Sequence, residues 1–219
     1  MRIFVLGGSG RTGKQILSQS LDRGHHVQAL VRNPDKISLN HPNLQLIKGD
    51  PALENDIIKG IEACEVVLSC LNISRRSDFP WARLRTPESF LSETMQRIIH
   101  AMHLHQIRRI IVVSAWGVRE TFPYLPGWFQ FLIKNSNIGV AYTDHEKQEA
   151  MLERQNLDWT IVRPVGLTSG RNLHKTRISI DNQPKPNLLI SRAQLAAFML
   201  DIMERKQYFR EFLTVSSEK

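Results

Sequence analysis

Apolar residues come in short continuous runs along the chain, separated by segments in which they recur at helical spacing. Runs of this kind are typical of strands that are buried on both faces of a parallel sheet. They lie at residues 2–6, 27–31, 44–48, 65–71, 109–113, 160–163 and 212–215. Helical spacing follows at residues 11–23, 51–60, 87–105, 143–156 and 191–206. The alternation predicts an α/β fold, with a doubly wound parallel sheet and helices on both of its faces.

The length and composition of the chain fit one domain over residues 1–219. The 42% of hydrophobic and 23% of charged residues are ordinary for a globular protein of this size. Three segments depart from the regular alternation, at residues 73–86, 116–142 and 165–190. Ligands of open α/β sheets bind beyond the carboxyl ends of the strands. Because these segments follow predicted strands, we expect them to form the mouth of a substrate site.

A glycine-rich turn joins the first strand to the first helix. Gly7, Gly10 and Gly13 follow the apolar run and lead directly into helical spacing, with Thr12 among them. Glycines let the backbone approach a pyrophosphate, whose charge is met by free amides and by the positive end of the helix dipole. An ordinary strand-to-helix turn is the alternative, and the flanking strand and helix weaken it. The GxxGxxG spacing resembles that of the short-chain dehydrogenase/reductase superfamily, especially its atypical and extended members, and implies a Rossmann-like dinucleotide site.

Two arginines indicate which dinucleotide is bound. Arg32 stands at the end of the second strand, where an acidic residue would hold the ribose hydroxyls of NAD. A guanidinium suits a 2′-phosphate instead, and Arg11 in the glycine turn lies near the same position. Asp35 is the counter-argument, although it follows Pro34 and fits a turn better. We therefore expect NADP(H) rather than NAD(H).

The same resemblance assigns two further cofactor contacts. Asp50 follows the third strand, at the position where the superfamily contacts the adenine ring. It is also a candidate N-cap for the helix after Pro51, and the two roles are compatible. Residues 69–72, with Leu71 among them, end the fourth strand, where the backbone of these proteins lines the cofactor ribose.

The tyrosine and lysine that standard members of the superfamily carry four residues apart are missing. Residues 156–164 read Asn-Leu-Asp-Trp-Thr-Ile-Val-Arg-Pro, which is similar to a stretch of NmrA-like and other atypical members. Counting back from that stretch, His145 occupies the lysine position and Ala141 the tyrosine position. Tyr142 and Lys147 are nearby, but a spacing of five places them on different helical faces.

A second resemblance covers nearly the whole chain. Ser114 after the fifth strand, the run 142–145 and residues 190–200 are similar to the biliverdin reductase B/flavin reductase branch. That branch also lacks the tyrosine–lysine pair. The resemblance implies NADPH-dependent reduction of flavins or other planar conjugated acceptors, with Ser114 and His145 near the nicotinamide. We place Pro164, which ends the stretch described above, among the cofactor-binding residues.

Ser114 and His145 are therefore the candidate catalytic residues. Ser114 can donate a hydrogen bond to the carboxamide or the acceptor. His145 can bond the ribose or relay a proton, with Asp144 as a neighbour. The alternatives are a turn serine at a strand end and a histidine on the surface of a helix.

Aromatic and basic side chains gather in two of the irregular segments. An apolar lid over a planar substrate would use the aromatic group, which also suits core packing: Trp116, Phe122, Tyr124, Trp128, Phe129 and Phe131. The basic group surrounds Trp81 and can attract carboxylates or a flavin phosphate: Arg75, Arg76, Arg83 and Arg85. A solvated charged loop is the alternative for the arginines.

The net charge of +8, from 29 basic and 21 acidic residues, favours anionic ligands. The basic residues form no long stripe, so we expect no nucleic-acid partner. No apolar stretch is long enough to cross a bilayer, and we expect a cytoplasmic protein without a membrane partner. Cys64 and Cys70 suit reduced core thiols, and we expect no metal site. A monomer or a homodimer, paired through residues 87–105 and 143–156, fits the pattern.

These inferences lead to two functions. The first is an NADP(H)-dependent reductase that transfers hydride to a flavin, a quinone or a similar planar, possibly anionic acceptor. The second is a non-catalytic NADP(H)-binding redox sensor of the NmrA type, which binds the cofactor to control a protein partner. A nucleotide-sugar epimerase is disfavoured, because such enzymes use the missing pair and a larger carboxyl-terminal domain.

Overall fold

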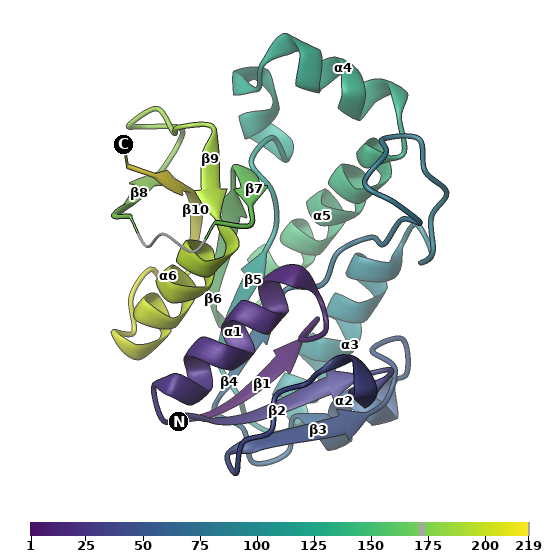
Figure 1. Cartoon of the computed structure of the whole chain (residues 1–219), viewed down its shortest axis with the longest axis vertical. Coiled ribbons are helices and arrows are strands. Elements are labelled where there is room, and N and C mark those ends of the chain that lie inside the picture. Colours follow the sequence, from purple (N-terminus) through teal and green to yellow (C-terminus); the bar gives the residue numbers. More distant parts are fainter. Residues whose placement is uncertain (171–173, 219) are drawn as a thin grey trace.

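A mostly parallel eight-stranded sheet forms the centre of the molecule in the computed structural model, which describes residues 1–170 and 174–218 (Figure 1). The strand order is β3-β2-β1-β4-β5-β6-β10-β8. The strands are β1 (Arg2–Leu6), β2 (His26–Val31), β3 (Leu44–Lys48), β4 (Val66–Ser69), β5 (Arg109–Val113), β6 (Asp158–Pro164), β8 (Thr176–Ser179) and β10 (Glu211–Ser217). The edge strand β8 runs antiparallel to β10, and the other pairs are parallel. The predicted doubly wound sheet is confirmed.

Helices cover both faces of this sheet. The helices on the two faces are α1 (Arg11–Asp22), α2 (Glu54–Gly60), α3 (Phe90–Leu104), α5 (Ile138–Glu153) and α6 (Arg192–Glu204). Neighbouring strand residues point to opposite faces: Ile111 packs in one core with α1 and α6, and Ile110 packs in another with α2, α3 and α5. Both side chains are fully buried. Because both faces are covered, the strands are apolar throughout rather than alternating.

The order of the strands reverses between β1 and β4. From this point β2 and β3 extend in one direction, and β5, β6 and β10 extend in the other. Leu6 at the end of β1 pairs with Ser69 at the end of β4, and the Cys70 amide donates to the Leu6 carbonyl oxygen at 3.0 Å. The turn after β1 therefore lies at the topological switch point, where ligands of such sheets bind.

The sequence pattern misses several elements. They are the 3-10 helices η1 (Pro34–Lys36) and η2 (Arg119–Tyr124), the helix α4 (Gly127–Asn135), the edge strand β8 and a two-stranded sheet of β7 (Gly166–Thr168) and β9 (Leu189–Ser191). All of them except η1 lie in or at the edge of the irregular segments. The apolar residues of α4 spread over more than half of its circumference, which is wider than the stripe of a typical amphipathic helix: Trp128, Phe129, Phe131, Leu132 and Ile133. Within the described residues, no helix is long and apolar enough to span a membrane.

Candidate functional site

Two glycines of the turn after β1 are required by close backbone contacts. Gly7 has φ +80°, and a Cβ there would lie 2.8 Å from the carbonyl carbon and oxygen of Cys70. A Cβ on Gly13 would lie 2.1 Å from the Gly7 carbonyl oxygen. The turn can therefore sit against the end of β4, and α1 against the turn, only without these side chains.

Gly10 is different, because neither its backbone conformation nor its contacts require a glycine. Its backbone is extended, with φ −75° and ψ 168°, and the residue is exposed. A Cβ would meet the Gly7 carbonyl oxygen at 3.1 Å and nothing else within 4 Å. Gly10 is the N-cap of α1 and has no side chain to cover the first amides of the helix, those of Arg11 and Thr12 among them. An anion can approach these amides directly, so the cradle fits a dinucleotide pyrophosphate.

The two arginines assigned to the cofactor differ in their surroundings. Arg32 is exposed just beyond β2, and within residues 1–170 and 174–218 its side chain makes no hydrogen bond or ion pair. Arg11 begins α1, and its guanidinium binds Asp78 through two hydrogen bonds of 2.9 and 3.1 Å. The Arg11 guanidinium holds the pKa of Asp78 below its usual value. A phosphate contact by Arg11 would therefore have to displace or share Asp78.

Asp35 and Asp50 both hold local turns. Asp35 lies in η1, and its amide donates to the Asn33 side chain at 3.0 Å, which confirms the turn role. Asp50 accepts a hydrogen bond from the amide of Ala52 at 3.0 Å. The N-cap of α2 is Leu53, so the interpretation of Asp50 as that N-cap is wrong. Its contact with an adenine ring stays a prediction.

The backbone predicted to line the cofactor ribose lies beside the glycine turn. A Cβ on Gly7 would come within 3.1 Å of the Leu71 amide nitrogen, which follows Cys70 at the end of β4. Burial raises the pKa of the Cys70 thiol, like that of Cys64, to about 12, so both thiols stay protonated at neutral pH. Leu71 therefore lies beside the glycine turn, and its contact with the cofactor ribose stays a prediction.

Ser114 faces an interior carboxylate. Its hydroxyl donates to Glu149 Oε1 at 2.6 Å, and both side chains are buried. Glu149 also accepts from the Arg163 guanidinium, at 3.0 Å from Nε and 2.6 Å from Nη2. The Ser114 proton is therefore used in the hydrogen bond to Glu149. The lone pairs of its oxygen can still accept a hydrogen bond from an amide such as a carboxamide. The predicted contact with the nicotinamide thus stays a prediction, with Ser114 as acceptor rather than donor.

The Glu149–Arg163 ion pair was not predicted from the sequence. Arg163 lies in β6 with a side chain only 2% exposed, stacks on Phe212 at 4.5 Å and also donates to Glu120. An arginine inside an apolar strand was the available signal, because a buried guanidinium needs a carboxylate partner. Pro164 follows Arg163 and is buried at the end of β6.

His145 is a buried side chain of α5, not the surface histidine of the alternative interpretation. It is 3% exposed, and burial lowers its pKa to about 4. Gln148 Nε2 donates to its Nδ1 at 3.4 Å. Asp144 does not assist it, because the Asp144 carboxylate accepts from the amides of Leu91 and Ser92 at the start of α3, at 2.6 and 3.3 Å. A neutral His145 can bond a ribose hydroxyl but is a weak base for proton relay.

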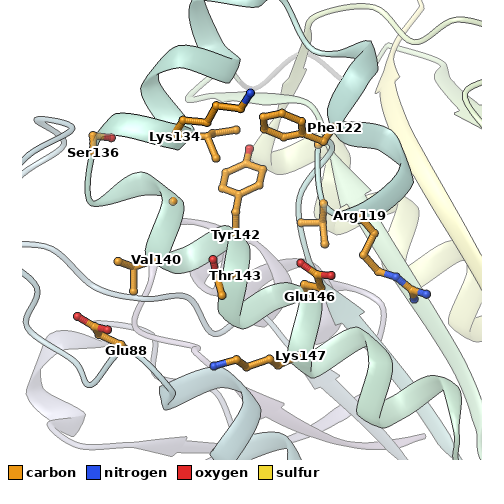
Figure 2. Close-up of a pocket in the computed structure, with 14 residues that line it drawn as sticks. Glu88, Arg119, Phe122, Lys134, Ser136, Val140, Tyr142, Thr143, Glu146 and Lys147 are labelled. Atoms are coloured by element: carbon orange, nitrogen blue, oxygen red, sulfur yellow. The ribbon is translucent and has the colours of Figure 1, made fainter.

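A cavity of about 790 Å³ lies between η2, α4 and α5 (Figure 2). Figure 2 shows the Tyr142 ring directed toward Phe122 and Lys134, with Lys147 at the opposite end near Glu88. Tyr142 and Lys147 thus line one cavity, although their spacing predicts different faces of α5. The Tyr142 hydroxyl donates to the Trp116 carbonyl oxygen at 3.2 Å, and burial raises its pKa above the ordinary range. The phenol therefore stays protonated at neutral pH, and its hydrogen is bonded to that carbonyl oxygen.

A second cavity, of about 770 Å³, separates two of the predicted mouth segments. Trp116, Tyr124 and Leu125 line one side of it, and Leu188 and Leu189 line the other. Segments 116–142 and 165–190 meet beside this cavity, where the Trp116 indole nitrogen donates to Asn182 Oδ1 at 3.3 Å. The aromatic residues of segment 116–142 divide between core packing and an exposed surface suited to a lid. Trp116 is buried and Phe122 and Phe129 are half-buried, whereas Tyr124, Trp128 and Phe131 are exposed.

The buried imidazole of His145 makes folding stability depend on pH. Its pKa falls from about 6.5 when unfolded to about 4 when folded, so stability is full above pH 6.5 and is lost as the pH falls toward 4. From pH 7 to pH 4 this group should cost about 3 kcal/mol. Urea unfolding of wild type and His145→Gln at both pH values checks this. Equal losses in the two proteins would contradict the assignment.

Comparisons with known proteins agree with this geometry. The sequence profile of a family described as NAD(P)H-binding matches residues 7–206. The photosystem II assembly factor Ycf39 of Synechocystis sp. is 27% identical over 171 residues, which are 78% of this chain and 46% of that protein. The chain spans about half the length of the curated relatives that it matches in this way.

Solved structures share the fold over the whole chain. The anaerobilin reductase ChuY of Escherichia coli O157:H7 has a TM-score of 0.81 at 18% identity, over 100% of this chain and 98% of that one. A short-chain dehydrogenase/reductase of Veillonella parvula, solved in complex with NADP, has a TM-score of 0.78 at 18% identity, over 99% and 94%. The chain belongs to the NAD(P)H-binding family, and it shares its fold with these solved reductases.

Proposed function

We propose that the protein is an NADP(H)-dependent reductase that transfers hydride to a flavin, a quinone or a similar planar conjugated acceptor. The observation that carries this proposal is the protonation chemistry of α5. Ala141 stands in the tyrosine position, His145 has a pKa of about 4, and the Tyr142 hydroxyl is bonded to a backbone carbonyl. Ala141 thus has no proton to give, His145 is neutral at pH 7, and the Tyr142 proton is held by the Trp116 carbonyl, so none of the three matches the tyrosine acid of an alcohol–carbonyl enzyme.

Flavins and quinones remove that need. When bound, the nicotinamide supplies a hydride, and a conjugated ring that receives it can take its proton from water. The chain then has to hold two flat rings together and exclude side reactions. The Gly10 cradle would hold the pyrophosphate, His145 a ribose hydroxyl, and the Ser114 oxygen the carboxamide.

The preference for NADP(H) rests on Arg32. Its guanidinium is exposed beyond β2, and it has no carboxylate partner within the described ranges 1–170 and 174–218. A 2′-phosphate would gain charge-assisted hydrogen bonds there without displacing another group. Arg11 is less available, since two of its N–H groups already donate to Asp78.

One observation favours the second function, a cofactor-binding sensor. The Arg11–Asp78 ion pair ties the irregular segment 73–86 to the glycine turn. A cofactor phosphate that binds Arg11 would break this ion pair and free the segment to move. A protein partner that binds only one position of the segment would then distinguish the cofactor-bound form from the free form. The reductase remains the first proposal, because the α5 chemistry accounts for the acceptor class as well.

The acceptor is tested by following NADPH absorbance with riboflavin, FMN and a panel of quinones. We expect turnover with at least one of them, and a rate without an inflection near the ordinary histidine pKa between about pH 6 and 8. Thermal shifts with NADPH, NADH and their oxidised forms run in parallel. Cofactor binding without oxidation of NADPH by any acceptor would favour the sensor.

The two classes of glycine can be separated by substitution. Gly10→Ala should fold with a melting temperature near that of wild type but bind NADPH about tenfold or more weakly, because the methyl group obstructs the open amides. Gly13→Ala should lose much of its folding stability, because its Cβ overlaps the Gly7 carbonyl. Thermal melting and NADPH titration measure both effects. Wild-type NADPH affinity in Gly10→Ala would argue against the cradle.

Arg32→Ala tests the cofactor preference. We expect the dissociation constant for NADPH to rise by about 10- to 100-fold and that for NADH by less than about twofold, because only NADPH carries the 2′-phosphate. Arg205→Ala, which removes an exposed arginine at the end of α6, is the matched control and should change neither constant. An equal loss for both cofactors in Arg32→Ala would refute the NADP(H) assignment.

A further inference from the structure

Four large aromatic side chains stand exposed on two irregular segments that follow strand ends. Phe79 and Trp81 lie in segment 73–86, with exposed fractions of 61% and 48%. Trp128 and Phe131 lie one turn apart on α4, with exposed fractions of 67% and 61%. We call these four residues the aromatic tip. Water-exposed rings in such number usually mark a contact surface.

The two segments are joined to one another. Segment 73–86 is a hairpin, closed by the antiparallel bridge between Arg75 and Leu84. The Trp81 indole nitrogen donates to the Asn135 carbonyl oxygen at 2.7 Å, at the end of α4. Figure 1 shows α4 at the top of the molecule, away from the sheet, with the hairpin beside the start of α5. The tip is therefore one ordered projection built from two segments.

The charge around the aromatic tip is strongly positive. Residues 74–86 and 127–137 contain five cationic side chains and one acidic side chain, a net charge of +4: Arg75, Arg76, Arg83, Arg85 and Lys134 against Asp78. Asp78 is bound to Arg11 of the glycine turn. Arg76, Arg83, Arg85 and Lys134 are exposed. Half of the net charge of +8 of the whole chain thus lies in these two segments.

The shape of the aromatic tip limits what can cover it. None of the four rings lines either cavity described above, so the tip is a projection and not a groove. A symmetric contact between two copies would bring two surfaces of charge +4 together, which is unfavourable. A surface that is negatively charged and that apolar rings can penetrate would suit both the projecting rings and the cations.

We propose that the aromatic tip binds the surface of an anionic lipid bilayer. Trp and Phe side chains partition into the interface between headgroups and acyl chains, and each nearby Lys or Arg adds attraction to anionic lipids. This proposal departs from the expectation that the protein has no membrane partner. That expectation rested on the lack of a long apolar stretch, which bears on crossing a bilayer and not on surface binding. The proposal is independent of the reductase activity.

Tryptophan fluorescence gives a specific readout for this contact. The chain has four tryptophans; Trp116 and Trp159 are 6% and 3% exposed, whereas Trp81 and Trp128 belong to the tip. Vesicles of phosphatidylcholine with about 30% phosphatidylglycerol should shift the emission to the blue and carry the protein in flotation. Pure phosphatidylcholine vesicles should do so about tenfold less, and added salt should weaken binding to the anionic vesicles.

Substitutions show whether the aromatic tip makes this contact. Trp128→Ala with Phe131→Ala should lower the partition coefficient about tenfold or more. Leu53→Ala with Leu104→Ala is the matched control, since these side chains are 58% and 56% exposed elsewhere, and it should bind as wild type. Arg76→Glu with Arg83→Glu keeps the rings but reverses charge, and it should also release the protein. Thermal melting verifies that each variant is folded.

Three results would overturn the proposal. One is equal flotation of wild type and the Trp128/Phe131 variant. Another is no vesicle binding by wild type, together with a concentration-dependent dimer in sedimentation that the same substitutions abolish. The last is no vesicle binding, together with a raised KM for a flavin or quinone in the Trp128/Phe131 variant, which would identify the rings as a substrate lid.

Discussion

The contact between the glycine turn and the end of β4 determines where every other part of the candidate site lies. Gly13 sits against Gly7, and Gly7 sits against Cys70, at distances that no Cβ would allow. This stack fixes α1 on the sheet at the point where the strand order reverses. The open amides at Gly10, the arginine beyond β2 and the ends of β5 and β6 then face the same edge of the sheet.

The repetitive part of the fold could be predicted because burial on both faces leaves a clear pattern. The strand at residues 44–48 and that at 109–113 match their predicted bounds. The pattern fails where an element is short or has a broad apolar face. Helix α4 has nine residues, with apolar side chains over more than half of its circumference, and the strands β7 and β9 have three residues each. Contacts with segments distant in the sequence, which no local pattern contains, decide whether such elements form.

The sequence predicted which elements carry the candidate residues, but not the partners of their side chains. The sequence places Ser114 at a strand end and His145 on a helix, as the structure does. It does not reveal that the Ser114 proton goes to Glu149, nor that Asp144 turns toward the start of α3. Those directions depend on buried charges from distant segments. A pattern read along one segment cannot show which of two carboxylates, five residues apart on α5, a hydroxyl will meet.

The charges around Arg163 join η2 to the interior. Arg163 binds fully buried Glu149 on one side and half-exposed Glu120 of η2 on the other, while Arg119 binds Glu153. Residues of η2 also border both cavities, through Phe122 and Tyr124. Moving η2 outward would strip a carboxylate from a guanidinium that has little water to replace it. This surface turn is therefore stiffer than its exposure indicates, and the two cavities keep a fixed relation to one another.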